Sequence, residues 1–288
     1  MIKRMMIAVA LTASMPFSGA YAEMQKLGEN TYHFFDGGYG SLVVVGSNGA
    51  LVVDPANPER AKKLKAEVAQ ITDKPVTHVV LSHEHYDHVG GTEVFNNAEI
   101  VCQEGCQAIF DLDVMGLVPE KVTMSFAEKL SIDLGEVTTE LHFFGAGDGV
   151  ATSVAYVPQD GVAATTDLYD PYSLTNGRWI DDSNFLGKRK ILNEMARWNL
   201  KYSISGHSPD TTVKALDASR NYMNDLYTAV KEELDPVIAK GGLWPAYQLL
   251  SGDLPSNLKL PAYKEWDGYN EHLSRHIWRM GMSIAHGG

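Results

Sequence analysis

The chain has few of the residues that mark several common protein classes. Only two cysteines occur among its 288 residues, which excludes a disulfide scaffold and a zinc module built on several thiolates. Basic residues are outnumbered, with 24 Lys and Arg against 36 Asp and Glu. The longest basic run after Arg4 is Lys188-Arg189-Lys190. We therefore expect no nucleic acid partner, because binding to phosphates needs a basic face.

A stretch long enough to cross a membrane is also missing, since no segment reaches about 20 apolar residues. Residues 1–22 instead combine a basic start at Lys3 and Arg4, a short apolar stretch and an Ala20-Tyr21-Ala22 motif before Glu23. This pattern predicts a secretory signal peptide. We expect a periplasmic or secreted protein without membrane contact after cleavage, and a mature net charge of 22 − 36 = −14.

Export from the cytoplasm would permit the two cysteines to pair. Cys102 and Cys106 are four residues apart, and Val101 and Cys102 look like the end of a strand. This spacing makes a bridge geometrically uncertain. We expect two buried free cysteines, with a disulfide as the alternative.

Apolar segments of strand length alternate with helical periodicity, which predicts an α/β fold. From Thr211 the pattern is helical, and Pro236 is expected to kink or end that helix. The tail from Leu243 is rich in Trp, Tyr and Leu and predicts a packed helical extension. Strands are predicted at 31–35, 41–45, 50–53, 76–81, 138–144, 153–157, 161–165 and 202–205, and helices at 58–71 and 184–198.

Four potential metal ligands follow the predicted strand that ends at Leu81. They form the pattern His83-x-His85-x-Asp87-His88, followed by Gly90-Gly91. Imidazoles and a carboxylate crowded at one strand end would desolvate and repel one another unless a cation lay among them. The segment therefore predicts a metal site.

This motif resembles the signature of the metallo-β-lactamase superfamily, whose fold is an αββα sandwich with metals at one edge between the sheets. The resemblance runs from about Lys26 to about Pro209. It implies a metallo-β-lactamase domain at 23–215 and a C-terminal helical extension at 216–288. The extension resembles, more weakly, the periplasmic quinoprotein-relay or Sox-associated branch. Further similarities are Val52-Val53-Asp54, Thr166-Asp167 and Ser205-Gly206-His207-Ser208.

The resemblance implies a binuclear zinc site with two metals per chain. Its implied roles are first-metal ligands His83 and His85, second-metal ligands Asp87, His88 and His207, a bridging Asp167, and Asp54 as support for the motif loop. Asp87 or Asp167 would orient the nucleophile. Asp167 stands where thiolate-type β-lactamases carry cysteine, which argues against dedicated β-lactam hydrolysis.

One position departs from the family pattern. Asp148 follows Gly145-Ala146-Gly147 where the family has the third histidine of metal one. Asp148 could bind the metal, His142 could substitute from the preceding strand, or metal one could be weakly held or absent. We favour Asp148, because oxygen ligation is normal for zinc and alternation turns His142 toward the sheet.

A third aspartate changes the charge of the centre. With a bridging hydroxide it would cancel the charge of two divalent ions, leaving a weaker Lewis acid. Replacing Asp148 by histidine is then expected to raise the affinity of site one. Two histidines and one carboxylate are also the ligand set that non-haem iron(II) favours.

Several aromatic residues are candidates for the substrate pocket, with simple loop packing as the alternative. They are Tyr39, Tyr86, Tyr169, Tyr172 and Trp179.

These observations favour a zinc-dependent hydrolase that uses a metal-bound hydroxide on an ester, lactone, β-lactam or related bond of a small molecule. A first rival is a mononuclear iron enzyme similar to persulfide dioxygenases, with Fe²⁺ on His83, His85 and a carboxylate. A second is a non-catalytic metal-binding protein with a degenerate site.

Overall fold

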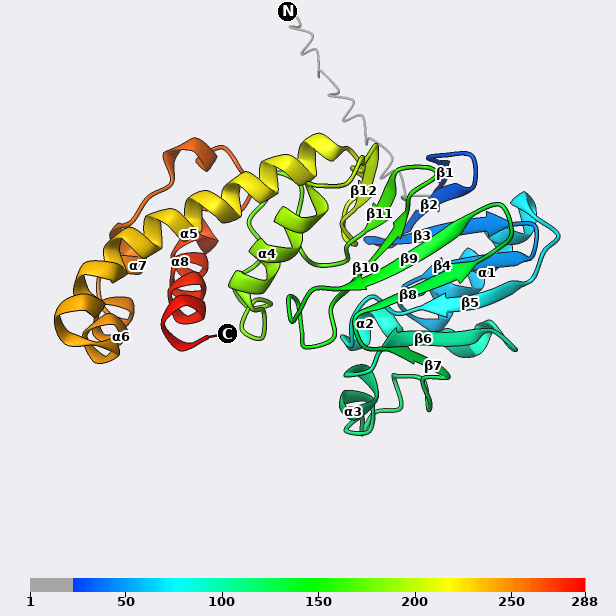
Figure 1. The fold of residues 1–288 in the computed structure, drawn as a ribbon, viewed down its shortest axis with the longest axis horizontal. Coiled ribbons are helices and arrows are strands. Elements are labelled where there is room, and N and C mark those ends of the chain that lie inside the picture. The colour runs from blue at the N-terminus through cyan, green and yellow to red at the C-terminus, as the bar shows by residue number, and fades with distance from the viewer. Residues whose placement is uncertain (1–22, 288) are drawn as a thin grey trace, which may run out of the picture.

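The computed structural model describes residues 23–287, and the predicted signal peptide lies outside the described residues. Strands make up one side of the view in Figure 1, and the C-terminal helices make up the other. No helix in the described range is both long and apolar enough to cross a bilayer.

The first sheet has seven strands in sequence order. Its first four strands pair antiparallel, whereas β4 to β7 run parallel. The strands are β1 (Glu23–Lys26), β2 (Thr31–Asp36), β3 (Tyr39–Gly46), β4 (Gly49–Val53), β5 (Val76–Val80), β6 (Glu99–Gln103) and β7 (Met124–Phe126).

The second sheet has five strands in the order β12-β11-β10-β9-β8. All neighbours are antiparallel except β11 and β12, which are parallel. The strands are β8 (Lys129–Asp133), β9 (Thr138–Phe143), β10 (Ser153–Val157), β11 (Val162–Ala164) and β12 (Tyr202–Ile204).

Alternate residues of the central strands serve two different cores. Leu51 and Val53 of β4 pack between the sheets, whereas Val52 packs under α1 with Leu64. Such strands are buried on both faces, as expected for sheets covered by helices. The helices of this first layer are α1 (Pro58–Ile71), α2 (Tyr86–Val89), the short 3₁₀ helix η1 (Thr92–Val94) and α3 (Cys106–Phe110).

The outer face of the second sheet belongs to a core that also contains residues of the remaining helices. Val154 and Tyr156 of β10 share a core with residues of α4, α5 and α8. The predicted αββα sandwich with a C-terminal helical extension is thereby confirmed (Figure 1). The helices are α4 (Phe185–Met195), α5 (Val213–Gly241), α6 (Leu243–Ser251), α7 (Leu254–Asn257), η2 (Pro261–Tyr263) and α8 (Tyr269–His286).

Of the two effects expected of Pro236, a kink or the end of the helix, the second is wrong. Helix α5 continues through Pro236 to Gly241. Pro236 and Glu232 are exposed, so water can satisfy the Glu232 carbonyl that the proline leaves without its usual partner. Packing of Leu226, Val230 and neighbouring residues in the core then stabilises the continuous helix.

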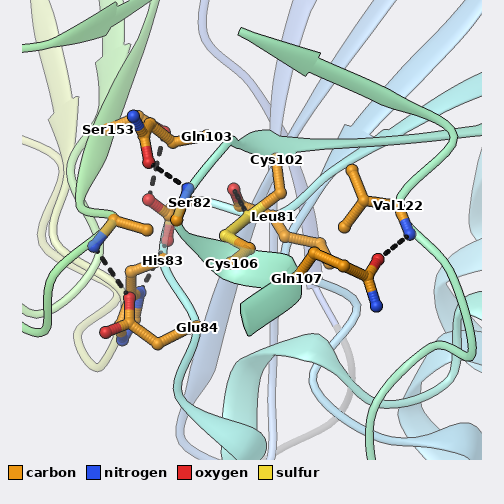
Figure 2. Close-up of a disulfide and its surroundings, with 12 residues drawn as sticks. Leu81, Ser82, His83, Glu84, Cys102, Gln103, Cys106, Gln107, Val122 and Ser153 are labelled. Atoms are coloured by element: carbon orange, nitrogen blue, oxygen red, sulfur yellow. Dashed lines mark hydrogen bonds between the residues drawn. A yellow bond between two sulfur atoms is a disulfide. The ribbon is translucent and has the colours of Figure 1, made fainter. Parts of the chain in front are cut away.

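The expectation of free cysteines is also wrong, because Cys102 and Cys106 form a disulfide (Figure 2). Cys102 belongs to β6 and Cys106 begins α3. The turn between them brings the two Cα atoms to 6.2 Å, within the range that a disulfide spans. Both residues are fully buried in the core beneath α1.

Candidate metal centre

The candidate site lies where parallel strands of both sheets end. Asp54 follows β4, and the segment 82–88 follows β5 in the first sheet. Asp167 and His207 follow β11 and β12 in the second sheet. The carboxyl ends of neighbouring parallel strands meet at one edge, so residues far apart in the sequence come together.

Seven side chains gather at this edge in two groups, and within each group the potential ligand atoms lie within 4.8 Å of one another. Six of these residues are ligands implied by the family resemblance, and the seventh is Asp148, which stands in place of the third histidine of metal one. The first group is His83, His85, Asp148 and Asp167, and the second is Asp87, His88 and His207.

Asp167 lies between the two groups. Its Oδ2 is 3.6 Å from His83 Nε2 and 2.9 Å from His88 Nε2. Its Oδ1 is 3.1 Å from His207 Nε2. Asp167 has a φ of 63°, a left-handed conformation that is costly for a residue with a side chain. The strained backbone conformation thus occurs at the residue that could bridge two ions.

The site has the properties that a metal ion requires. His83 Nε2, His88 Nε2 and Asp167 Oδ1 are buried without a partner in hydrogen-bond geometry. The second ring nitrogen is held in place in two of the histidines: His207 Nδ1 is 3.0 Å from the Gly38 carbonyl, and His83 Nδ1 is 2.9 Å from Ser82 Oγ. Such contacts orient ligating imidazoles, so this donor set fits divalent metal ions.

Without a cation, protons compensate the charge of the carboxylates. Burial would lower the pKa of His88, but the charges and hydrogen bonds of Asp167 and Asp87 together outweigh burial and raise that pKa well above its usual value. Burial would likewise lower the pKa of His85, but hydrogen bonds to Asp148 and Asp182 raise it to about 10. Burial lowers the pKa of His83 to about 3. A bound metal would take the place of these protons.

Two buried carboxylates hold the motif loop. Asp54 Oδ1 accepts a hydrogen bond from the Ser82 amide at 2.8 Å, and its Oδ2 accepts one from Thr166 Oγ1 at 2.5 Å. Asp54 thus joins the loop after β5 to the loop after β11, as its implied supporting role requires. Burial raises the pKa of Asp54.

Glu84 provides the second support. Its carboxylate accepts hydrogen bonds from the Val150 amide at 2.6 Å and the Ala151 amide at 3.1 Å. The Ser153 amide donates to the Ser82 carbonyl at 2.7 Å. Figure 2 shows Glu84, Ser82 and Ser153 on one side of the disulfide. These bonds tie the motif loop to the segment that carries Asp148.

Asp148, rather than His142, lies at the first group. Asp148 Oδ2 is 3.3 Å from His85 Nδ1. His142 instead faces Glu140, at 2.9 Å, and its ring packs against Trp198. Strand alternation therefore gives the correct orientation of His142.

The sequence pattern of the metallo-beta-lactamase superfamily matches residues 36–185, just over half of the chain. The chain belongs to the metallo-β-lactamase superfamily. A "Metallo-beta-lactamase from Pontibacter korlensis" has a similar structure, with a TM-score of 0.61 at 19% identity over 70% of this chain and 99% of that one. This second similarity concerns the fold alone.

A curated protein is similar in sequence. The "2,4-dinitroanisole O-demethylase subunit beta" of Nocardioides sp. (strain JS1661) is 26% identical over 199 residues, which cover 67% of this chain. The present chain spans 60% of the length of that relative.

The aromatic residues predicted to line a substrate pocket differ in their packing and exposure. The Tyr39 ring packs against His88 and His207, with centroids 5.4 and 4.9 Å away. Tyr86 is half-buried and Trp179 is 71% exposed. Tyr172 packs edge-on against Trp266.

Tyr169 differs from expectation. It is buried in the core, and its hydroxyl donates to Ser203 Oγ at 2.8 Å. Its ring lines a small pocket of about 30 Å³ beside the C-terminal helices. Tyr169 is therefore a packing residue, because a side chain engaged in this way is not free to contact a substrate.

Sequence reasoning missed three residues that contact the candidate metal centre. The Lys188 ammonium pairs with Asp148 Oδ1, Ser183 Oγ donates to the same oxygen at 2.5 Å, and Asp182 Oδ2 is 3.0 Å from His85 Nε2. A signal for Lys188 was present. It lies on the apolar face of α4, three and four residues before the buried Ile191 and Leu192, where a lysine needs a partner.

Proposed function

We propose that this chain is a zinc-dependent hydrolase with a binuclear metal site. The observation that carries the proposal is the pair of adjacent ligand groups, joined by Asp167 and containing buried imidazole nitrogens that lack a partner in hydrogen-bond geometry. When bound, the metals would activate water and polarise the bond under attack.

The residues of the chain divide into holding and substrate-facing groups. His83 and His88 are buried, which fixes their rings, while Asp87 and His207 lie on the open side. The Tyr39 hydroxyl donates to Asp87 Oδ2 at 3.4 Å. Asp87 is therefore placed to orient the attacking nucleophile and to accept its proton, with Tyr39 holding the carboxylate.

A small-molecule substrate with a hydrolysable bond suits this arrangement. The class is open among esters, lactones, β-lactams, thioesters and phosphoesters, because variable loops set it and the shared fold does not. The name of the relative adds 2,4-dinitroanisole, a methyl ether, as a compound to test.

A mononuclear iron enzyme is the second candidate. It is favoured by the composition of the first group, in which His83, His85 and Asp148 form a set of two histidines and one carboxylate. Metal identity separates the two candidates.

The decisive measurement is elemental analysis of protein purified without added metal. We expect two zinc ions per chain. His88→Ala and His207→Ala should each lose about one equivalent together with hydrolysis of an ester, lactone, β-lactam and phosphodiester panel, whereas His286→Ala, an exposed histidine at the end of α8, should lose neither. One iron and no zinc would instead support the dioxygenase candidate, and no metal at all would reject both.

We also propose that the protein acts outside the cytoplasm. The support is the basic, apolar and Ala-x-Ala pattern of residues 1–22. Intact mass of the exported protein should correspond to a chain that begins at Glu23. Retention of Lys3 and Arg4 in that product would reject export with cleavage.

A further inference from the structure

Lys188 is a buried cation at the edge of the candidate metal centre. Its side chain is 4% exposed, and its ammonium pairs with Asp148 Oδ1. The same ammonium donates to the Asp167 carbonyl at 2.8 Å. A buried charge is costly unless it is paired, so α4 places this lysine against a carboxylate of the site.

The two oxygens of Asp148 have different environments. Oδ1 accepts a hydrogen bond from Ser183 Oγ and forms an ion pair with the Lys188 ammonium. Oδ2 lies on the other side, 3.3 Å from His85 Nδ1. One oxygen is thus held by the protein, and the other faces the group of potential ligands.

The segment that supplies Ser183 is itself held by the C-terminal extension. Arg279 of α8 donates to the Ser183 carbonyl at 2.5 Å, and Arg275 pairs with Asp181. The Phe185 amide donates to Ser283 Oγ of α8 at 3.2 Å. Helix α8 therefore stabilises the position from which Ser183 and Lys188 reach Asp148.

We propose that Lys188 is a positioning residue for metal site one. It holds Asp148 so that Oδ2 is presented as the ligand, and its positive charge offsets the carboxylate. The Asp148–Lys188 pair then substitutes, as a neutral ligand, for the neutral imidazole of the family pattern. This inference rests on the proposed metal centre and extends it to a residue beyond the ligands.

Charge supports this assignment. Asp87, Asp148 and Asp167 contribute three negative charges to the two groups. Lys188 reduces the sum to −2, the value of a site with two aspartates and no lysine. The expectation that Asp148 leaves the centre with less positive charge, and that histidine at 148 would raise the affinity of site one, did not include this lysine. With Lys188 present we expect the opposite for Asp148→His alone.

Lys188→Met is the first test, because methionine keeps most of the length and removes the charge. We expect its zinc affinity at site one to fall by about 10- to 100-fold, as for other residues that orient metal ligands. Stoichiometry at a fixed free zinc concentration should decline from two to one, and the visible spectrum of the Co²⁺-substituted protein should lose the site-one bands. Lys214→Met, an exposed lysine in the first turn of α5, should behave as wild type.

A charge-matched pair of variants separates positioning from a general effect on folding. Asp148→His alone should bind metal one weakly, because an ammonium is left beside a neutral ligand and repels the cation. Asp148→His combined with Lys188→Met should bind two metals again. This comparison decides the matter even where Lys188→Met by itself folds poorly, and thermal unfolding of each metal-free variant monitors the fold.

Results that would overturn the role of Lys188 can be told apart from results that would reject the proposed function. Two metals held equally tightly by wild type and Lys188→Met, with identical Co²⁺ spectra, would overturn the inference and leave the proposed function intact. A gain of a second metal in Lys188→Met would show that the lysine blocks site one, which also overturns it. A wild-type protein without any metal would reject the proposed function itself.

Discussion

Glu84 is a single side chain on which the geometry of the candidate site depends. It occupies a variable position of the motif, yet it is buried and satisfies two backbone amides of the 148–151 segment. The segment approaches closely because Gly149, with a φ of 81°, has no side chain; a Cβ there would lie 2.4 Å from Glu84 Oε1. The Glu84 carboxylate therefore occupies the space that a side chain at position 149 would need.

Replacing Glu84 by alanine should destabilise the protein and weaken metal site one. Two backbone amides would lose their acceptor, and for the buried Ala151 amide the cost is about 1–3 kcal/mol. We would measure urea unfolding of the metal-free protein and zinc binding of the folded protein. Glu84→Gln, which keeps one acceptor oxygen, should be intermediate, and an alanine variant with wild-type stability would contradict this account.

His276 is a buried histidine outside the metal site. Its Nδ1 is 2.9 Å from the Tyr222 hydroxyl, and its Nε2 is 2.8 Å from the Thr175 carbonyl. Burial lowers its pKa to about 4. The neutral ring thus links α8 to α5 and to the loop after Asp167.

This depressed pKa predicts an acid-sensitive fold. The unfolded chain binds a proton at His276 near pH 6.5 and the folded chain only near pH 4, so stability is complete above pH 6.5 and is lost as the pH falls toward 4. Between pH 7 and pH 5 the contribution of His276 should decline by about 2 kcal/mol. Urea unfolding at both values should show a smaller pH dependence for His276→Gln, and an unchanged dependence would argue against this assignment.

At the level of elements, the strand β6 and the helix α3 are joined beside the metal loop. The Cys102–Cys106 disulfide closes a short turn, and Cys102 Sγ lies 3.4 Å from the Leu81 carbonyl (Figure 2). Leu81 directly precedes the motif segment. The disulfide therefore stabilises the local chain reversal that packs under the strand leading to the ligands.

Removing this disulfide should have a moderate effect. Closing so short a loop removes little entropy from the unfolded chain, and the expected loss for Cys102→Ser with Cys106→Ser is about 2 kcal/mol. Guanidinium unfolding of the oxidised wild type and the double variant would measure it, with reduced wild type as a control. Metal stoichiometry should be unchanged, and loss of both metals would show that the bridge positions the ligand loop directly.

At the level of the whole molecule, the C-terminal extension enlarges the core on the outer face of the second sheet and supports the site. Helices α5, α6 and α8 share one core with β10 and α4. Figure 1 shows α4 between the strands and these C-terminal helices. Arg275, Arg279 and Ser283 of α8 contact the 181–185 segment. Stability of the sandwich and the geometry near Asp148 are thus linked through this extension.

Deleting Leu243–Gly288 should yield insoluble or partly folded protein. The deletion exposes the apolar faces of α4 and α5 and removes the partners of the 181–185 segment. Solubility, circular dichroism and thermal unfolding of the truncated chain would test this. A soluble truncation with the melting behaviour of the full chain would show that the extension is dispensable for the fold.

Local sequence determined the fold class and most of the candidate ligands. Apolar periodicity predicts the strands and helices, and the residues that follow β4, β5, β11 and β12 are Asp54, the His83–His88 motif, Asp167 and His207. Strand ends that share a sheet edge bring their next residues together, so these positions could be assigned from the sequence and the family pattern.

Tertiary packing alone decided the remainder. Lys188 and Ser183 reach Asp148 only because α4 packs on the second sheet and α8 holds the segment before it. The pairing of Cys102 with Cys106 similarly depends on the turn into α3. Periodicity reports which face of an element is buried. The partner of the buried Lys188 charge depends on how distant elements are oriented, and the pairing of the cysteines depends on the conformation of a turn, and periodicity encodes neither.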